Sequence, residues 1–388
     1  MRYEQRQFPP TPSPFFRLTL TPEGGTIIRV KIREITEAEK AAFNGFVADF
    51  PTGDLMQSWE WGEIKRKSGG WKPVRVICED DGGKIVATAS ILMRRIPRTG
   101  KCIAYCSRGP VLDTTDAELV TALFDGLKKI ATKHGAILLK IDPPVPIEDT
   151  DSPINLERAG FKLVADPTGF GGTQPKCVMQ LDLDMSIDDL MASFKPKWRY
   201  NIRLAEKKGV TVKSDCTKED LRKFYDLLLV TARRDKFLVR GYSYFETMWD
   251  ALVPAGYAKL FLTLQDDTLL AGAFDFIIGD RACYVYGASS NEHRNLMPNH
   301  LMQWTAIQWA KEQGCKWYDF RGVSPRRDAT EEDDHLQGLN RFKEGFSPRY
   351  VEYIGEYDTV LSPMWYWLWV RVKPAALRLL KKRAKLEE

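Results

Sequence analysis

Hydrophobic and polar positions follow the same succession of patterns twice along the chain. Residues 71–96, "WKPVRVICEDDGGKIVATASILMRRI", alternate as two strands joined by a tight turn, and residues 257–279 repeat this pattern. In both regions a third strand, a helix with a 3.6-residue period and a fourth strand follow. A helix with an acidic first turn precedes each set. Hairpins followed by a helical crossover predict a mixed α/β sheet, and the repeated succession predicts two of them.

Short local sequences support the repeat. "DDGG" and "QDDT" stand at the two hairpin turns, "KHGA" and "EQGC" where helix passes to strand, and "ERAGF" and "KEGF" close the two sets. Agreement at all three places is improbable by chance. This order of elements resembles the acyltransferase fold of the GCN5-related superfamily. The expected fold class is therefore α/β (α+β), with tandem GCN5-related N-acetyltransferase-like (GNAT-like) domains and mixed sheets flanked by helices.

The length of the chain suits two domains. Its 388 residues are 44% hydrophobic, which suffices for a core in each domain. The first residues, including "FPPTPSPFF", have no periodicity and predict a flexible arm. The expected division is an arm at 1–25, a first domain at 26–182, a second domain at 183–358 and a Trp-rich, basic C-terminal segment at 359–388.

Charge and cysteine content narrow the function classes. The 57 cations exceed the 52 carboxylates by five, and residues 371–388 alone hold seven cations against two carboxylates. The rest of the chain is near neutral, so general nucleic-acid coating is not expected. Seven scattered cysteines and no opening secretory signal favour a reduced, cytoplasmic protein. We expect no metal site and no membrane span.

The GNAT-like pattern raises the question of the acyl donor. Acetyl-CoA users of that superfamily hold the pyrophosphate on a Gly-rich loop that opens the helix after the central strand. The equivalent segments here, "LDTTDAEL" and "RNLMPNHL", contain no glycine. A coenzyme A donor is thus disfavoured, we expect no cofactor, and a different activated acyl donor is required.

Several segments together identify a family. "MQSWEWGEIKRKSGGWKP", "KPKWRYNIRLAEKKGV" and "GLNRFKEGFSPRYVEYIGEYD" strongly resemble the Fem (FemABX) transferases of the peptidoglycan interpeptide bridge, and the likeness runs from about residue 27 to 360. Some members insert a helical arm in the second domain. The stretch between Gly209 and Phe237 has room for one helix only, so this chain is similar to the armless FemX type.

The resemblance implies a function. It implies that aminoacyl-tRNA donates an amino acid to the side-chain amine of the stem peptide in UDP-MurNAc-pentapeptide or lipid II. It also implies precursor binding in the first domain and a tRNA side, with the basic helix 195–209, in the second. We expect direct attack by the amine, because the four histidines form no triad with Ser or Cys. We also expect the protein to be a monomer. Two alternatives are a tRNA-dependent transferase to another acceptor, such as a lipid, and a non-catalytic module that binds precursor or tRNA. An acetyl-CoA transferase ranks below both.

The basic stretch "KPKWRYNIRLAEKKG" predicts an anion site. Arg199, Arg203 and Lys207 recur every four residues and would form one cationic stripe on a helix. A solvated helix face is the alternative. The resemblance implies that Arg199 or Arg203, together with Lys65, contacts the phosphates of the precursor, and it assigns Tyr244 to substrate binding as well.

"YCSRGPVLD" ends a strand where a ligand cleft is expected. The resemblance places Tyr105 and Asp113 in the acceptor-peptide site, where Asp113 would orient or deprotonate the incoming ammonium group. Capping of the following helix is an equal alternative for Asp113. Arg108 would meet a carboxylate or phosphate of the substrate, or pair with Asp113.

"RFKEGF" supplies the catalytic candidate. Attack on an ester generates an oxyanion, which a neighbouring cation stabilises in the transition state. The resemblance gives this role to Lys343 and sets Phe342 near the acceptor end of the tRNA. In the alternative, Phe342 and Phe346 belong to the core and Lys343 points to water.

The C-terminal segment joins aromatic and basic residues. Trp365, Trp367 and Trp369 alternate as on a strand and precede seven cations. This juxtaposition is typical of a membrane interface, so peripheral contact with the inner face of the membrane is one expectation. Cover of the first domain's core by the tryptophans is the other.

Overall fold

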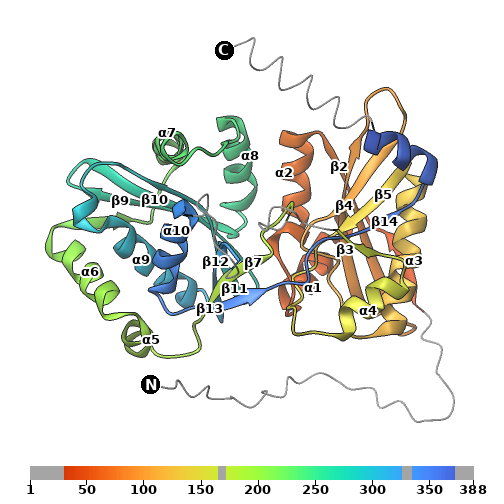
Figure 1. The fold of residues 1–388 in the computed structure, drawn as a ribbon, viewed down its shortest axis with the longest axis horizontal. Coiled ribbons are helices and arrows are strands. Elements are labelled where there is room, and N and C mark those ends of the chain that lie inside the picture. The colour runs from red at the N-terminus through yellow and green to blue at the C-terminus, as the bar shows by residue number, and fades with distance from the viewer. Residues whose placement is uncertain (1–29, 165–171, 326–333, 372–388) are drawn as a thin grey trace.

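The computed structural model describes residues 30–164, 172–325 and 334–371, and it contains two separate seven-stranded sheets (Figure 1). The expected arm and most of the basic C-terminal segment lie outside the described residues. Within the described ranges, no helix is both long enough and apolar enough to cross a membrane.

The first sheet has the order β1-β2-β3-β4-β5-β14-β6. Its neighbours are antiparallel except for β4 and β5, which run parallel because helix α3 crosses over between them. Asp116 caps α3 by accepting hydrogen bonds from the backbone amides of Glu118 and Leu119. The strands are Lys31–Glu34 (β1), Trp71–Glu79 (β2), Ile85–Arg95 (β3), Cys102–Cys106 (β4), Ala136–Ile141 (β5), Lys162–Leu163 (β6) and Tyr357–Val360 (β14), and the helices are Glu37–Glu39 (η1), Lys40–Asp49 (α1), Leu55–Gln57 (η2), Trp59–Gly69 (α2), Ala117–Lys133 (α3) and Asp151–Arg158 (α4).

The second sheet has the order β13-β7-β12-β11-β10-β9-β8. Its one parallel pair, β11 and β12, is again joined by a helix, α9. The predicted repeat of hairpin, strand, helix and strand is therefore confirmed. The strands are Cys177–Asp182 (β7), Val210–Lys213 (β8), Ala258–Gln265 (β9), Thr268–Ile278 (β10), Arg281–Ser289 (β11), Trp317–Gly322 (β12) and Arg349–Glu352 (β13), and the helices are Ile187–Ser193 (α5), Pro196–Lys207 (α6), Lys218–Asp235 (α7), Tyr242–Leu252 (α8), Arg294–Leu296 (η3), Pro298–Glu312 (α9) and Asp334–Glu344 (α10).

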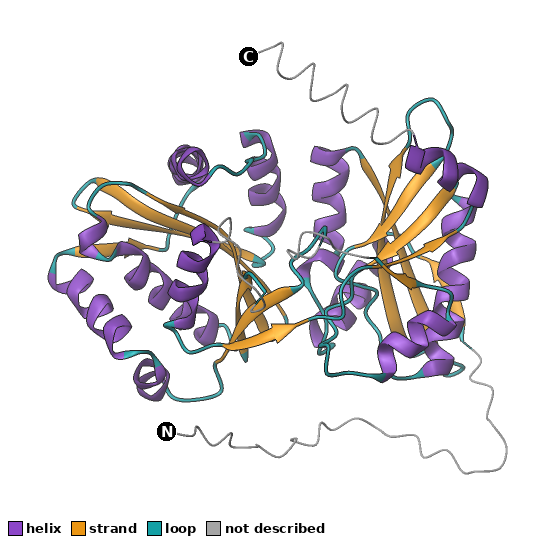
Figure 2. Cartoon of the chain, in the orientation of Figure 1, coloured by secondary structure: helices purple, strands orange, loops and turns teal. Residues whose placement is uncertain are grey.

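The two sheets exchange strands at the ends of the repeats. β7 precedes the expected boundary at residue 182, yet it pairs with β12 and β13 of the second sheet. β14 comes after every strand of the second sheet in the sequence, yet it pairs with β5 and β6 of the first sheet. The chain thus passes between the domains twice, and Figure 2 shows strands and helices distributed over both.

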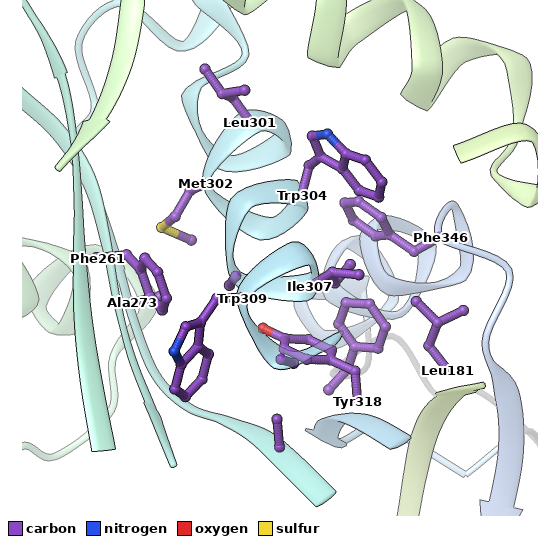
Figure 3. Close-up of a cluster of buried hydrophobic side chains, with 14 of the residues drawn as sticks. Leu181, Phe261, Ala273, Leu301, Met302, Trp304, Ile307, Trp309, Tyr318 and Phe346 are labelled. Carbon is purple, nitrogen blue, oxygen red and sulfur yellow. The ribbon is translucent and has the colours of Figure 1, made fainter. Parts of the chain in front are cut away.

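Three large clusters of buried apolar side chains hold the structure together. One lies within each domain, and Figure 3 shows part of the second-domain cluster, where Trp309 of α9 packs with Phe261 and Trp304 lies beside Phe346. The third cluster spans the domains and joins side chains of α1, α2, β2 and β3 with those of α7, α8, β9 and β10. The domains therefore share a core, which fixes α2 against α8.

The C-terminal segment differs from the prediction. Residues 363–371 form a helix, so the strand expected from the alternating tryptophans is wrong. The backbone amides of Leu361 and Ser362 both bond to the carbonyl of Ile137, which ends the pairing of β14, and Pro363 then opens the helix. Proline suits a first helical position because its missing N–H is not needed there.

Phe276→Ala tests the shared core. Phe276 is 2% exposed and packs edge to face with Trp61 of the other domain at 6.4 Å. We expect a loss of about 3–5 kcal/mol in the free energy of unfolding, from the removed contacts and the cavity left behind. Urea unfolding followed by fluorescence measures it. Tyr200→Ala, whose ring is 62% exposed, is the control and should change the stability by less than about 0.5 kcal/mol. Equal effects of the two variants would contradict a shared core.

Candidate functional site

Two cations, Lys65 and Arg240, lie where α2 of the first domain packs against α8 of the second. Ser58 starts α2 by accepting a hydrogen bond from the amide of Trp61, and the Trp61 ring is buried in the shared core. Lys65, one turn later, donates a hydrogen bond to the hydroxyl of Tyr244 at 2.8 Å and lies 4.2 Å from the Trp61 ring centre. The guanidinium of Arg240, just before α8, lies over the Tyr244 ring, 4.9 Å from its centre. Two cations from different domains therefore share one aromatic surround.

The described residues supply no carboxylate that pairs with these two cations. Burial, followed by repulsion from Arg240, lowers the pKa of Lys65 to about 7. Burial, followed by the neighbouring Tyr286, raises the pKa of the Tyr244 hydroxyl, so that group stays protonated. No carboxylate in the described ranges lies within 4.0 Å of the Lys65 or Arg240 nitrogens. Such a pair of cations is suited to an anion with two charged groups, such as a diphosphate.

The predicted phosphate arginines lie elsewhere. Arg199 and Arg203 are on α6, which packs against α9 and β8, and Figure 1 shows α6 far from α2 and α8. Arg199 donates a hydrogen bond to the carbonyl of Ala192, and Arg203 is exposed. The structure therefore brings neither arginine to Lys65, and the arginine that lies near Lys65 is Arg240. The signal for Arg240 in the sequence is weak: it directly precedes the helix that carries Tyr244.

A buried polar network begins at the end of β4. Tyr105 donates a hydrogen bond to Asp142 at 2.7 Å, and the backbone amide of Arg108 donates to the other carboxylate oxygen at 2.5 Å. Burial raises the pKa of Asp142 to about 7, although the Arg108 charge opposes this. The Arg108 guanidinium donates to the carbonyl of Pro175 and lies 4.9 Å from the Tyr353 ring centre. Arg108 thus links the domains, and Asp142 is a buried acid that the sequence analysis missed.

An ion pair crosses the domain boundary next to this network. Arg321, at the end of β12, donates to Asp54 at 3.1 Å, and both side chains are largely buried. Burial acts to raise the pKa of Asp54, but Arg321 and Arg108 lower it below its ordinary value. Arg321 has a left-handed φ of 59°, and its backbone amide donates to Asp319. The pair holds the end of β12 against the first domain.

Lys343 points into the same region. It lies near the end of α10, is 3% exposed, and donates a hydrogen bond of 2.6 Å to the carbonyl of Gly322 at the end of β12. Burial lowers the pKa of Lys343 to about 7, although Asp319 opposes this. The alternative in which Lys343 points to water is therefore wrong. A lysine with this pKa can accept or donate a proton near neutral pH.

Phe342 faces a different space from Lys343. It lines two adjoining surface pockets of about 250 and 190 Å³. His300 lies between the rings of Trp198 and Phe342, with centroid distances of 5.4 and 5.2 Å. Burial, followed by the charge of Lys197, lowers the pKa of His300 to about 4, so the ring is neutral. Gly345 permits this packing, because a Cβ atom there would lie 1.9 Å from the Trp198 ring.

Cations surround the two pockets. Lys197 and Arg341 line one, and Arg294 lines the other beside the first residues of α9. The first turn of α9 has no side-chain cap, whereas the corresponding helix of the first domain, α3, is capped by its own Asp116. Cations and aromatic faces together suit a ligand that carries both phosphate and rings.

Asp113 takes part in a local turn. Its carboxylate accepts hydrogen bonds from the backbone amide and the hydroxyl of Thr115, and the residue is exposed. Asp116 caps α3, so Asp113 supports the turn before the helix. Arg108 does not pair with Asp113. The described residues also contain no group of three or more His, Cys, Asp or Glu that could hold a metal ion.

Sequence comparisons reveal relatives over most of the chain. The FemAB family model matches residues 36–263 and 256–373. The protein called "Lipid II:glycine glycyltransferase" of Staphylococcus aureus (strain USA300) is 32% identical over 413 residues, which cover 88% of this chain and 96% of that protein. The aligned length exceeds that of this chain, so the relative has residues that this chain lacks.

Structural comparisons agree. The crystal structure of FemX superimposes with a TM-score of 0.79 at 31% identity and covers 87% of this chain and 99% of FemX. A tandem GNAT protein from the clavulanic acid biosynthesis pathway reaches a TM-score of 0.53 at 13% identity, with 86% and 99% covered, and shows the fold alone. The predicted family and fold class are confirmed.

Lys65 should titrate near neutral pH. Competitive labelling of lysines with acetic anhydride, read by peptide mass spectrometry, should give Lys65 a midpoint near pH 7, far below the value of about 10.4 for an exposed lysine. In Arg240→Gln the midpoint should rise, because the repelling charge is gone. A midpoint of Lys65 near that of exposed lysines would contradict the burial of its ammonium group.

Proposed function

Because this chain belongs to the FemAB family, we propose that it is a tRNA-dependent aminoacyltransferase that lengthens the side chain of a peptidoglycan stem peptide. In this proposal an aminoacyl-tRNA gives its amino acid to the side-chain amine of the precursor, in the cytoplasm and without metal or coenzyme. The observation that carries it is the convergence of Lys65 and Arg240, from different domains, with no carboxylate of the described residues paired to either.

The acceptor is bound by its diphosphate. UDP-MurNAc-pentapeptide and lipid II both carry this group, and two cations about one tyrosine fit its two charges. The name of the Staphylococcus aureus relative specifies lipid II. We propose the lipid-linked form as the natural acceptor, so that the reaction takes place at the membrane surface. In this proposal the stem peptide extends from the diphosphate at Lys65 and Arg240 toward the network of Tyr105, Arg108 and Asp142.

The donor is bound at the pockets beside Phe342. The 3′ end of a tRNA presents flexible bases and phosphates, and proteins bind such ends with aromatic faces and cations. Trp198, His300 and Phe342 provide the faces, and Lys197, Arg294 and Arg341 provide the charges. In this proposal Arg199 and Arg203 of α6 serve the tRNA backbone, because α6 also carries Lys197 and Trp198 of the pocket.

The chemistry is direct aminolysis of an ester. The uncharged amine attacks the carbonyl carbon of the aminoacyl group and forms a tetrahedral oxyanion. The carbon–oxygen bond to the ribose then breaks, the leaving ribose oxygen takes up a proton to become a hydroxyl, and the attacking nitrogen loses one proton. Lys343 reaches the end of β12, where Arg321 pairs with Asp54 of the first domain, and its cationic form stabilises the oxyanion more than the ground-state ester. Its pKa of about 7 also suits it to pass the proton to the leaving oxygen.

Lys343→Met tests catalysis against binding alone. We expect transfer to fall by about 10²–10³-fold, as for loss of an oxyanion donor, while acceptor affinity remains within about twofold. Transfer is measured by mass analysis of the precursor after incubation with a mixed pool of charged tRNA. Lys311→Met is the matched control, because Lys311 likewise donates a hydrogen bond to a backbone carbonyl, that of Leu183, and has no part in the proposed site. If the unaltered protein binds precursor and yields no heavier product, the chain is a binding module.

Two double variants separate the acceptor site from the donor site. Lys65→Met/Arg240→Gln should raise KM for UDP-MurNAc-pentapeptide by at least about tenfold, because charged hydrogen bonds are lost, and leave KM for the tRNA nearly unchanged. Arg199→Gln/Arg203→Gln should raise the KM for the tRNA and leave the KM for UDP-MurNAc-pentapeptide nearly unchanged. This pair should also weaken the salt dependence of the KM for the tRNA. Steady-state kinetics at two salt concentrations measures both. If the second pair raised the acceptor KM instead, the phosphate site would belong to α6.

A further inference from the structure

The helix at 363–371 exposes a row of large apolar side chains. Met364, Trp367, Leu368 and Val370 are 72%, 55%, 43% and 49% exposed. Met364, Trp367 and Leu368 follow the i, i+3, i+4 spacing, so they share one helix face, and Arg371 continues that face with its guanidinium 3.8 Å from the Trp367 ring centre. Single exposed apolar residues are common on proteins, but a whole helix face is not.

The opposite face of this helix holds it in place. Trp365, Tyr366 and Trp369 are only partly exposed, and Lys101 Nζ lies 5.8 Å from the Trp365 ring centre. The chain enters the helix directly from hydrogen bonds with the start of β5. Figure 1 draws the helix in dark blue at the end of the first domain. The apolar row is therefore displayed from a fixed position on the domain.

Cations gather at the same end of the first sheet. Arg94 and Arg95 end β3, Arg98 stands in the turn to β4, and Lys72 begins β2 opposite Met93. All four are exposed. In the sequence, the helix is also followed directly by further cations, so that residues 371–388 hold seven against two carboxylates. The apolar row thus stands beside a strongly positive surface.

We propose that this end of the first domain is a membrane-binding surface, in which helix 363–371 inserts its apolar face into the headgroup region of an anionic bilayer. Tryptophan and methionine partition into this region, while flanking cations bind the negative headgroups. A second copy of the chain is a poor occupant, because a symmetric contact would bring the two sets of arginines together. Charge complementarity therefore favours the lipid surface.

The position of this surface deepens the proposed function, on which this step rests. α2 carries Lys65 and ends at Gly69, two residues before β2 begins at this same end of the sheet. A bilayer bound by helix 363–371 would therefore lie at the end of the first domain toward which α2 runs. A diphosphate attached to a lipid lies at the membrane surface. It would therefore be within reach of Lys65 and Arg240 on a domain that is bound to this surface.

Vesicle binding tests the surface without using transfer activity. The full-length chain should co-sediment with vesicles of 70% phosphatidylcholine and 30% phosphatidylglycerol, and at least about tenfold less with pure phosphatidylcholine or at 1 M salt. Trp367→Glu/Leu368→Glu should lower the partition coefficient at least about tenfold, because carboxylates oppose insertion. Ile154→Glu/Leu163→Glu, with side chains 48% and 56% exposed on the first domain, is the matched control and should bind like the unaltered chain, because Leu163 pairs with Tyr357 at the other end of β14 from the helix.

The remaining outcomes each decide the proposal. Both double variants alter exposed residues, so circular dichroism should show them folded, and both should use UDP-MurNAc-pentapeptide at the unaltered rate. Equal sedimentation of Trp367→Glu/Leu368→Glu and the unaltered chain overturns the proposal. The proposal is also overturned if the unaltered chain forms a dimer that Trp367→Glu/Leu368→Glu dissociates, and neither protein binds vesicles. If vesicles bind as expected while no precursor is modified, the surface stands and the proposed transfer fails.

Discussion

The packing of the two domains through one shared apolar core is the constraint on which the rest of the site depends. Lys65 and Arg240 belong to different domains and become neighbours only because α2 and α8 are fixed against each other by this core. The Asp54–Arg321 pair extends the contact into the polar region, where it also fixes the end of β12 beside Lys343. In the proposed function, affinity for the acceptor is thus a property of the interface, because each domain supplies one of the two cations.

Burial of lysines gives the interface its chemistry. Lys65 and Lys343 are both held where their charge is poorly solvated, and the pKa of each falls to about 7. A cation in such a place gains most when an anion arrives beside it, whether the diphosphate of an acceptor or the oxyanion of a transition state. Each lysine rests meanwhile on a neutral partner, Tyr244 or the carbonyl of Gly322, which an anion can displace or supplement.

Periodicity in the sequence was enough to predict the tandem fold, because strands and helices of both repeats alternate with clear turn signals. It could not predict that β7 and β14 exchange sheets, since pairing partners far apart in the chain leave no local pattern. The resemblance to Fem proteins pointed to Lys65, Tyr244 and Lys343, which the structure places at or beside the interface. The sequence did not single out Arg240, because the density of charge along α6 says nothing about which cation lies near Lys65 in space. The helix at 363–371 was missed because alternating tryptophans outweighed the Ser-Pro start signal.

Proton uptake on binding tests the central claim most directly. If a diphosphate settles beside Lys65, it should restore the positive charge of a lysine that is mostly neutral at pH 8. Calorimetric titration of UDP-MurNAc-pentapeptide at pH 8, in buffers of different ionisation enthalpy, should therefore show uptake of nearly one proton per site, and Lys65→Met should show almost none. Binding without proton uptake, or uptake that persists in Lys65→Met, would contradict the account.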